Sequence, residues 1–314
     1  MILLEQNEKD PYFNLAAEEF ILKNFDEEIL MLWQSSSSVV IGKHQNPFKE
    51  VNLPYVLKNK IPVLRRLSGG GTVFHDSGNI NFSFFSIPEH KDKMIRFEHF
   101  THPVIRFLNN LKINATLVGK NNIVAGNKKL SGNSAHIFKN KILHHGTLLF
   151  NSNLTHLRKS LTHESENFPT VIDRSIHSIK APVINIQKLI PGITKQTFFE
   201  QLQTFLKRSF LITQTRSLSV NEKKKIKKLA QEKYQNEEWI YGYSPDYHFL
   251  HQTDRDKIEL EVSKGKIQKI HIDGILKKFE ENLKGILHAP GEVQKLFQTE
   301  NPTSGTRLMT LLGF

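Results

Sequence analysis

The 314-residue chain contains no cysteine. This absence excludes disulfide bonds, thiolate metal sites and any mechanism that passes through a thioester on the protein itself. The chain also lacks an apolar run of the roughly 18 residues that a membrane-spanning helix needs, so we expect no membrane association. Its first residues include acidic side chains and lack the basic, acid-poor character of a targeting peptide.

Acidic residues are few relative to basic ones, with 31 Asp and Glu against 43 Lys and Arg and a formal net charge of +12. Such a surplus attracts polyanions by long-range steering. Nucleic acid, an acidic protein surface and phosphate-bearing small molecules are the candidate partners. The lysine-rich run at 223–228 is equally well explained as the solvated face of a helix.

Internal repeats and low-complexity linkers are absent, and the apolar periodicity indicates a mixed α and β chain. Helices are expected at 14–25 (behind an Asn14 cap), 48–59, 93–111, 195–209 and 220–234. Strands are expected at 29–33, 38–42 and 79–86 (with Ile80, Phe82 and Phe84 on one face), beside the glycines at 69–71, in short pieces within 114–150, and at 257–263 and 266–272. Turn residues Gly242 and Pro245 predict a boundary between a domain of residues 1–245 and a small α+β domain of residues 246–314.

Three consecutive glycines, 69–71, follow Arg65 and Arg66. Glycines let a backbone approach a ligand closely, and exposed N–H groups in such a turn can bind an anion. The two arginines supply permanently charged forks suited to carboxylate or phosphate. A flexible hairpin loop with two surface arginines explains the same residues, and the segment matches neither a P-loop nor a dinucleotide fingerprint.

Two further segments contain residues with chemical potential. If Leu130 faces one side of a strand, then Lys129 and Ser131 face the other, where the lysine would be a localised cation; a turn lysine in water is the alternative. His144 and His145 point to opposite faces of a strand, so they cannot readily bind one metal ion together. We therefore assign no protein-bound metal.

Taken together, these segments resemble the lipoate–protein ligase A family over nearly the whole chain. The resemblance rests on RRLSGGGTVFHDSGNINFSF, KKLSGNSA and HHGTLLFNSNL, preceded by VVIGKHQNPFKEVN (39–52) and followed by EEWIYGYSP (237–245). It implies a mixed α/β catalytic domain of the biotin/lipoate ligase type with a small C-terminal domain. It also implies ATP-dependent activation of lipoate, with Mg²⁺, to lipoyl-AMP, and transfer of the lipoyl group to a lysine of an acidic lipoyl domain.

The resemblance also assigns roles to residues. Lys129 falls on the family's essential lysine, which touches the activated carbonyl and the α-phosphate. The residues matched to ATP and lipoyl-AMP binding are Arg66, Gly71, Thr72, Val73, Phe74, Asn122 and Lys129. Those matched to the lipoate pocket are Ser68, Gly70, His75, Gly132, Ala135 and His145. One position departs from the family, which commonly has Asn-Asp where this chain has Asn121-Asn122; an amide cannot replace a carboxylate as a cation ligand or proton acceptor.

The expected carriers are 2-oxoacid dehydrogenase E2 subunits and the glycine cleavage H protein, and the expected state is a monomer in the cytoplasm, or in the mitochondrial matrix of a eukaryote. Three alternatives stay open. A transferase that accepts preformed lipoyl-AMP would share these motifs, whereas a cysteine-dependent octanoyltransferase would not. A biotin ligase fits the HHGTLL and EWIYG segments less well. A basic nucleic-acid-binding protein would need exposed aromatics along a basic groove, but the aromatics here fall in core-like patterns.

Overall fold

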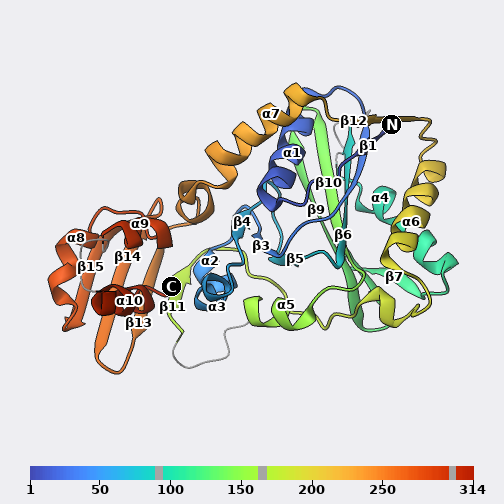
Figure 1. The fold of residues 1–314 in the computed structure, drawn as a ribbon. Helices are drawn as coiled ribbons and strands as arrows, with labels where there is room; N and C mark the ends of the chain where they lie inside the picture. The colour runs from blue at the N-terminus through green and yellow to red at the C-terminus, as the bar shows by residue number, and fades with distance from the viewer. Residues whose placement is uncertain (89–94, 162–167, 297–301) are drawn as a thin grey trace.

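A computed structural model of the chain describes residues 1–88, 95–161, 168–296 and 302–314 (Figure 1). Its centre is an eight-stranded mixed sheet in the order β12-β1-β2-β6-β10-β9-β8-β7, in which β1 runs parallel to both β12 and β2. The strands are β1 (Ile2–Glu5), β2 (Ile29–Trp33), β6 (Asn79–Ser86), β7 (Ala115–Val118), β8 (Asn122–Ala125), β9 (Lys128–Phe138), β10 (Lys141–Leu149) and β12 (Gln214–Ser217). The predicted strand at 79–86 is confirmed.

Helices cover both faces of this sheet. These helices are α1 (Pro11–Asn24), α4 (Phe97–Asn110), α6 (Lys195–Ser209) and α7 (Val220–Leu229). In Figure 1, α4 and α6 lie together on one side and α1 and α7 on the other. Ile80, Phe82 and Phe84 pack in the same core cluster as residues of α4 and α6, which confirms their predicted common face. The intervening Phe85 packs in the core of α1 and α7.

Several predicted boundaries are wrong for local reasons. Asn14 does not cap the first helix, because Asp10 does so and Pro11 starts the first turn; Asn14 is buried inside the helix and bonds to Gln6 and to the carbonyl of Gln34. The predicted helix 48–59 is two short helices, α2 (Pro47–Glu50) and α3 (Leu53–Lys58), because Asn52 caps a new start. The predicted helix 220–234 becomes a π-helical turn after Leu229. Of the predicted helix 93–111, residues 93 and 94 lie outside the described residues, and α4 itself begins at Phe97.

A second sheet holds the glycine segment. Its order is β4-β3-β5, with β3 (Ser38–Ile41), β4 (Val63–Arg65) and β5 (Val73–His75). Residues 66–72 connect β4 to β5, so the glycines lie between two strands as predicted. The pieces expected within 114–150 are four strands, of which β9 and β10 form a long hairpin that turns at Lys139, with φ of 54°. This hairpin places the second and third motifs side by side.

The C-terminal part forms a four-stranded antiparallel sheet in the order β11-β13-β14-β15. These strands are β11 (Thr170–Asp173), β13 (Tyr247–Gln252), β14 (Asp256–Ser263) and β15 (Lys266–Gly274). Strands β14 and β15 match the prediction, but β13 was missed, and β11 joins it from far earlier in the chain.

The remaining elements of the described chain are four helices and four turns. The helices are α5 (Leu154–Leu161), α8 (Glu280–Leu283), α9 (Pro290–Leu296) and α10 (Pro302–Leu311), and the turns are 3₁₀ at Ile186–Lys188 and Lys277–Phe279 and π-helical at Ala230–Tyr234 and Glu238–Gly242. Within the described ranges no helix has the length and apolar character to cross a membrane. The boundary at residue 245 stays a prediction.

Candidate functional site

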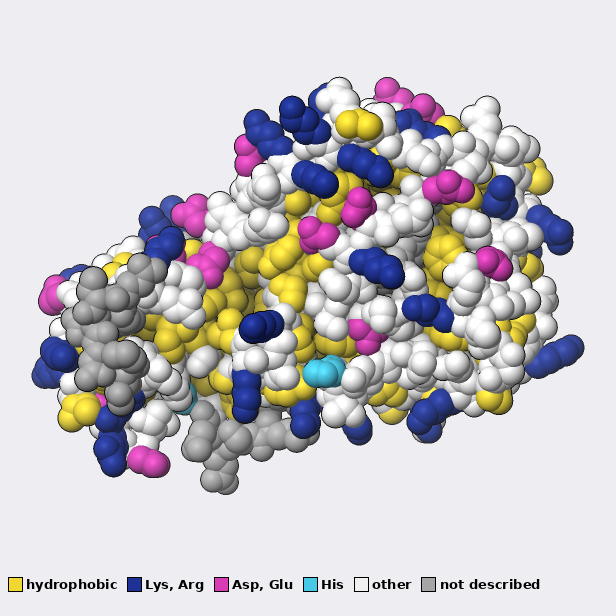
Figure 2. Space-filling model, in the orientation of Figure 1, with side chains coloured by type: hydrophobic (Ala, Val, Ile, Leu, Met, Phe, Trp, Pro, Cys, Tyr) yellow, Lys and Arg dark blue, Asp and Glu magenta, His cyan; other side chains and the backbone are white. Residues whose placement is uncertain are grey.

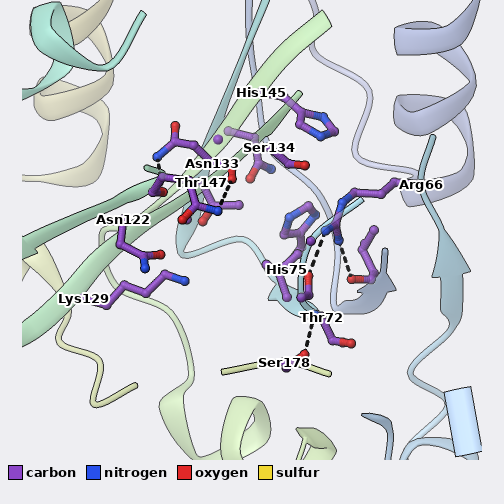
Figure 3. Close-up of a pocket in the computed structure, with 18 of the residues that line it drawn as sticks. Arg66, Thr72, His75, Asn122, Lys129, Asn133, Ser134, His145, Thr147 and Ser178 are labelled. Atoms are coloured by element: carbon purple, nitrogen blue, oxygen red, sulfur yellow. Dashed lines mark hydrogen bonds between the residues drawn. The ribbon is translucent and has the colours of Figure 1, made fainter. Parts of the chain in front are cut away.

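A pocket of about 270 Å³ lies where the glycine segment meets the β9–β10 hairpin (Figure 3). Its walls bring together most of the residues predicted from the sequence. Those that line it are Arg66, Gly70, Gly71, Thr72, Val73, His75, Asn122, Lys129, Gly132 and His145. Figure 3 shows Lys129 and Asn122 on one side of the pocket and Arg66 and His75 on the other.

Arg66 shapes the glycine segment from inside. Its side chain is 6% exposed, and its Nη2 donates hydrogen bonds to the carbonyl oxygens of Gly69 at 2.6 Å and Gly71 at 2.8 Å. Gly70 between them has φ of +88°, a conformation that side chains rarely adopt, so glycine is required at the bend. Burial lowers the pKa of Arg66 to about 10, which leaves the guanidinium charged at neutral pH.

Arg65 points elsewhere, which corrects the expectation that both arginines could meet an anion. It is fully buried and is bonded to backbone carbonyls on two distant stretches of chain. Its acceptors are the carbonyls of Gly42, Lys43, Gln45, Trp239 and Ile240 and the hydroxyl of Ser244. Arg65 is therefore a structural tie between residues 42–45 and 239–244.

Lys129 reaches the pocket from the start of β9. Its backbone N–H donates to Pro182 and its carbonyl accepts from Ile184, so the main chain is held on both sides. Its Nζ lies 2.9 Å from the position that a Cβ on Gly132 would occupy. Burial, and secondarily the charge of Arg66, lowers the pKa of Lys129.

Lys129 was predicted to share one face of the strand with Ser131, but only Lys129 lines the pocket. A register shift between β8 and β9 at Ile123 and Val124 changes the phase of the strand. Lys129 therefore shares the pocket wall with Gly132 and Ser134, whereas Ser131 is buried and accepts a hydrogen bond from the side chain of Asn133.

The histidine pair points to opposite faces of β10, as predicted. His144 is 1% exposed and stacks on Phe100 with ring centroids 5.1 Å apart, and burial lowers its pKa to about 3. His145 lines the pocket, with its Nε2 2.6 Å from the Ser68 hydroxyl and its Nδ1 3.0 Å from a carboxylate oxygen of Glu18. These contacts place His145 in a hydrogen-bond network.

His75 lies against the edge of Trp33, at 5.6 Å between ring centroids. Burial, and then the charge of Arg66, lowers the pKa of His75 to about 3, so this ring is neutral across the physiological range. Its Nε2 is buried and has no hydrogen-bond partner among the described residues. An unpaired buried nitrogen is costly unless a ligand or water satisfies it.

Three predicted site residues lie behind the pocket wall. Ser68 is fully buried and bridges Arg66 and His145. The side chain of Phe74 is in the hydrophobic core, and Ala135 is paired with His144 in the β9–β10 hairpin, next to the pocket-lining Ser134.

Sequence reasoning missed an entire wall. Ile176, His177, Ser178 and Ile179 line the pocket, and the Ser178 hydroxyl accepts a hydrogen bond of 2.8 Å from the backbone N–H of Thr72. The carboxylate of Glu50 accepts in turn from the backbone N–H of Ser178. This stretch has no periodicity or motif that could have indicated its role.

Amide side chains supply a further set of polar groups, of which Asn81 and Asn133 were not singled out from the sequence. Asn121 and Asn133 each donate from the side chain to the other's carbonyl oxygen, both at 3.0 Å. Asn81 lines the pocket with 1% exposure, and neither atom of its amide group has a partner in the described part of the chain. Together with Asn122, these amides can donate to and accept from a polar ligand.

Metal-binding side chains are scarce here. Among the described residues, no group of three or more His, Cys, Asp or Glu could hold a metal ion, and none of those lining the pocket is Asp or Glu. A hard cation such as Mg²⁺ prefers carboxylates and phosphate oxygens. The pocket therefore fits an anion, and Mg²⁺ bound there would be coordinated by oxygens of that anion.

The mixed sheet, the glycine turn, the buried Arg66 and the inward-facing Lys129 meet around one pocket, in a fold that solved lipoate protein ligase structures share. The family model for the lipoyl protein ligase A/B catalytic domain matches residues 10–207. The chain therefore belongs to the lipoate–protein ligase family, as the motifs predicted, and is a ligase.

Individual relatives agree. The chain is 37% identical over 278 residues to the lipoate-protein ligase LplJ of Bacillus subtilis, covering 86% of this chain and 83% of that protein. A crystal structure of lipoate-protein ligase A bound with ATP superposes with a TM-score of 0.64 at 26% identity, over 77% of this chain and 98% of the other. The structure of the bi-partite lipoate protein ligase of Thermoplasma acidophilum, studied with its E2 lipoyl domain, superposes with a TM-score of 0.67 at 25% identity. The match covers 77% of this chain and 96% of the other.

Proposed function

We propose that this ligase converts lipoate and ATP to lipoyl-AMP and pyrophosphate, and then transfers the lipoyl group to a lysine of an acidic lipoyl domain. One observation carries the proposal: Arg66 and Lys129 lie on opposite sides of one pocket, which Gly70 and Gly71 of the glycine turn also line. ATP enters as its Mg²⁺ complex, which we treat as the substrate. The complete activation step distinguishes this function from transfer of preformed lipoyl-AMP.

In the first step the lipoate carboxylate attacks the α-phosphorus of ATP. The carboxylate is ionised at neutral pH, so no general base is needed. The obstacle is electrostatic, because two unit negative charges 4 Å apart repel by about 4 kcal/mol at an effective dielectric of 20. The guanidinium of Arg66 and the ammonium of Lys129 oppose this repulsion and hold the two reactants in line.

In the second step a lysine of the carrier attacks the acyl carbonyl, and AMP leaves. Negative charge grows on the carbonyl oxygen and on the departing phosphate. Lys129 can stabilise both, because its side chain is half-buried, has no ion-pair partner among the described residues and is held at the start of β9. The attacking lysine has to be neutral, and desolvation at the interface with the carrier lowers its pKa.

The remaining pocket residues divide by chemistry. Leu15, Trp33 and Val40 are apolar and would enclose the hydrocarbon chain beside His75 and His145. We assign the nucleotide to the backbone of Gly71–Phe74 and to Asn122. Because Asn122 is an amide, it can bond to the ribose or the phosphates but adds no negative charge to hold Mg²⁺.

The proposed carriers are 2-oxoacid dehydrogenase E2 subunits and the H protein, with the enzyme acting as a monomer in the cytoplasm or mitochondrial matrix. The formal charge of +12 supports an acidic carrier. Figure 2 shows Lys and Arg side chains spread over the whole viewed face of the molecule, and not gathered in one groove. The net charge of the whole molecule, and not a patch on this face, therefore supports long-range attraction of an acidic domain.

The decisive experiment incubates the enzyme with lipoate, ATP–Mg²⁺ and an apo lipoyl domain, and measures pyrophosphate together with the mass of the carrier. We expect stoichiometric pyrophosphate and a carrier heavier by one lipoyl group. Lys129→Ala should abolish the mass gain while circular dichroism shows a folded protein. Carrier modification from lipoyl-AMP, but none from lipoate and ATP, would establish the transferase in place of the ligase.

A further inference from the structure

A buried carboxylate of helix α1 reaches toward the pocket without lining it. Glu18 is 2% exposed, and its Oε1 lies 3.0 Å from Nδ1 of His145. The same oxygen accepts a hydrogen bond of 2.6 Å from the hydroxyl of Ser83, which in turn accepts one of 2.8 Å from the indole N–H of Trp33. The carboxylate therefore meets two pocket-lining residues, His145 directly and Trp33 through Ser83.

From His145 the chain of hydrogen bonds continues to Arg66. The His145 Nε2 lies 2.6 Å from the Ser68 hydroxyl, and Nε of Arg66 donates to that hydroxyl at 2.9 Å. The four groups thus connect helix α1 to the glycine turn through Glu18, His145, Ser68 and Arg66. Every member is buried or nearly so, which shields these bonds from competition with water.

The direction of donation along this chain is fixed at both ends. A guanidinium can only donate, so the Ser68 oxygen accepts from Arg66. An ionised carboxylate can only accept, so Nδ1–H of His145 donates to Glu18. In a neutral ring the other nitrogen, Nε2, then accepts from the Ser68 hydroxyl.

This chain of hydrogen bonds also connects Arg66 to a negative charge. In the described residues the hydrogen bonds of Arg66 go to carbonyl and hydroxyl oxygens: Val40, Ser68, Gly69 and Gly71. None of these oxygens is charged. The charge of Glu18 acts on Arg66 from the far end of the chain and opposes the effect of burial on its pKa.

We propose that Glu18 is a positioning residue for acyl-adenylate formation. Through His145 and Ser68 it orients the guanidinium of Arg66, whose Nη2 holds the carbonyls of Gly69 and Gly71 and so sets the curvature of the glycine turn. This inference rests on the proposed function, because it assigns Glu18 to the pocket in which lipoate and ATP react. Glu18 itself does not touch the reacting atoms.

The neighbouring Glu19 provides a matched control. It lies on the same helix and is also 2% exposed, but its carboxylate bonds to Lys23, Lys233 and Tyr234, away from the pocket. Both residues are changed to glutamine, which preserves volume and removes the charge. A general effect of losing a buried carboxylate would appear in both variants.

We expect Glu18→Gln to raise the KM for lipoate in pyrophosphate release about tenfold, the effect of weakening one charge-assisted hydrogen bond. Glu19→Gln should lower the melting temperature but leave the KM of the folded enzyme within twofold. Ser68→Ala should raise this KM as much as Glu18→Gln does. The double variant should also show a KM raised about tenfold, and not a hundredfold, because both changes break the same chain of hydrogen bonds. A normal KM in Glu18→Gln, or equal defects in both glutamine variants, would overturn the proposal.

A second measurement does not depend on turnover. The ring ¹⁵N shifts of His145 should show the Nδ1–H tautomer in the wild type and a mixture of tautomers in Glu18→Gln, because an amide can both donate and accept. Calorimetry should show weaker binding of a non-hydrolysable lipoyl-AMP analogue to that variant. If the wild type releases no pyrophosphate, the proposed function fails while these readouts still test Glu18. An Nε2–H tautomer in the wild type would refute the positioning chain alone.

Discussion

Replacing Gly132 by alanine tests the position of the Lys129 amine without removing it. An added Cβ would lie 2.9 Å from Nζ and 3.1 Å from Cε of Lys129. Carbon atoms pack best at about 3.5–4.0 Å, so the end of the lysine has to move by roughly 0.5–1 Å. Because the clashing atoms are the far end of a flexible side chain, and because alanine is better suited to a strand than glycine, the fold should be retained.

A displacement of about 1 Å in a catalytic group can reduce the rate on the order of 100-fold. We therefore expect Gly132→Ala to lower kcat/KM for lipoate-dependent pyrophosphate release by roughly 10- to 100-fold, with a melting temperature within a few degrees of the wild type. The matched control is Gly192→Ala, since a Cβ there meets no atom within 4 Å. A folded Gly132→Ala enzyme with wild-type kcat/KM would refute the placement of the amine in the reaction.

The other predictions concern pH and salt. His144 has a pKa of about 3 in the folded protein against about 6.5 when unfolded, so the unfolded chain binds more protons between these values and stability falls as the pH drops below about 6.5. His144→Leu should reduce this slope by up to about 1.4 kcal/mol per pH unit in urea unfolding between pH 7.5 and 5; an unchanged slope would argue against a neutral buried ring. Raising salt from 50 to 300 mM should increase the KM for the carrier several-fold while hardly affecting pyrophosphate release without carrier, because exposed charges are screened. Equal salt sensitivity of both reactions would contradict electrostatic capture of the carrier.

Sequence patterns predicted those parts of the protein whose structure is locally determined. The strand at 79–86 alternates between two buried faces, and three glycines between two apolar runs predict a tight connection. Arg66 and Lys129 were identified because the compact motifs that contain them resemble those of the lipoate–protein ligase A family; the segment alone did not distinguish Arg66 from Arg65. The prediction that Ser131 faces the same side of the strand as Lys129 was wrong. The side that Ser131 faces depends on a register shift with β8, which the sequence of β9 alone does not encode.

Features set by contacts between distant residues were missed. Glu18 stands in an Ala-Ala-Glu-Glu segment that is typical of a solvated helix face, and only the packing of α1 on the sheet directs it to His145, 127 residues away. The wall at 176–179 is likewise fixed by Glu50, which bonds to Ser178 across 128 positions. The pairing of β11 with β13 is a similar case, because neither strand contains a signal for its partner.

The bonds of Arg65 join the span matched to the catalytic family, residues 10–207, to residues that lie after it in the chain. A protein that ended before Trp239 would leave this guanidinium with acceptors only in the 42–45 turn and without those contributed by Trp239, Ile240 and Ser244. That turn supports the ligand site directly, because a side chain on Gly42 would collide with the carbonyl of Gly70. We therefore expect truncation after residue 207 to disturb the candidate pocket, although every residue that lines it would still be present.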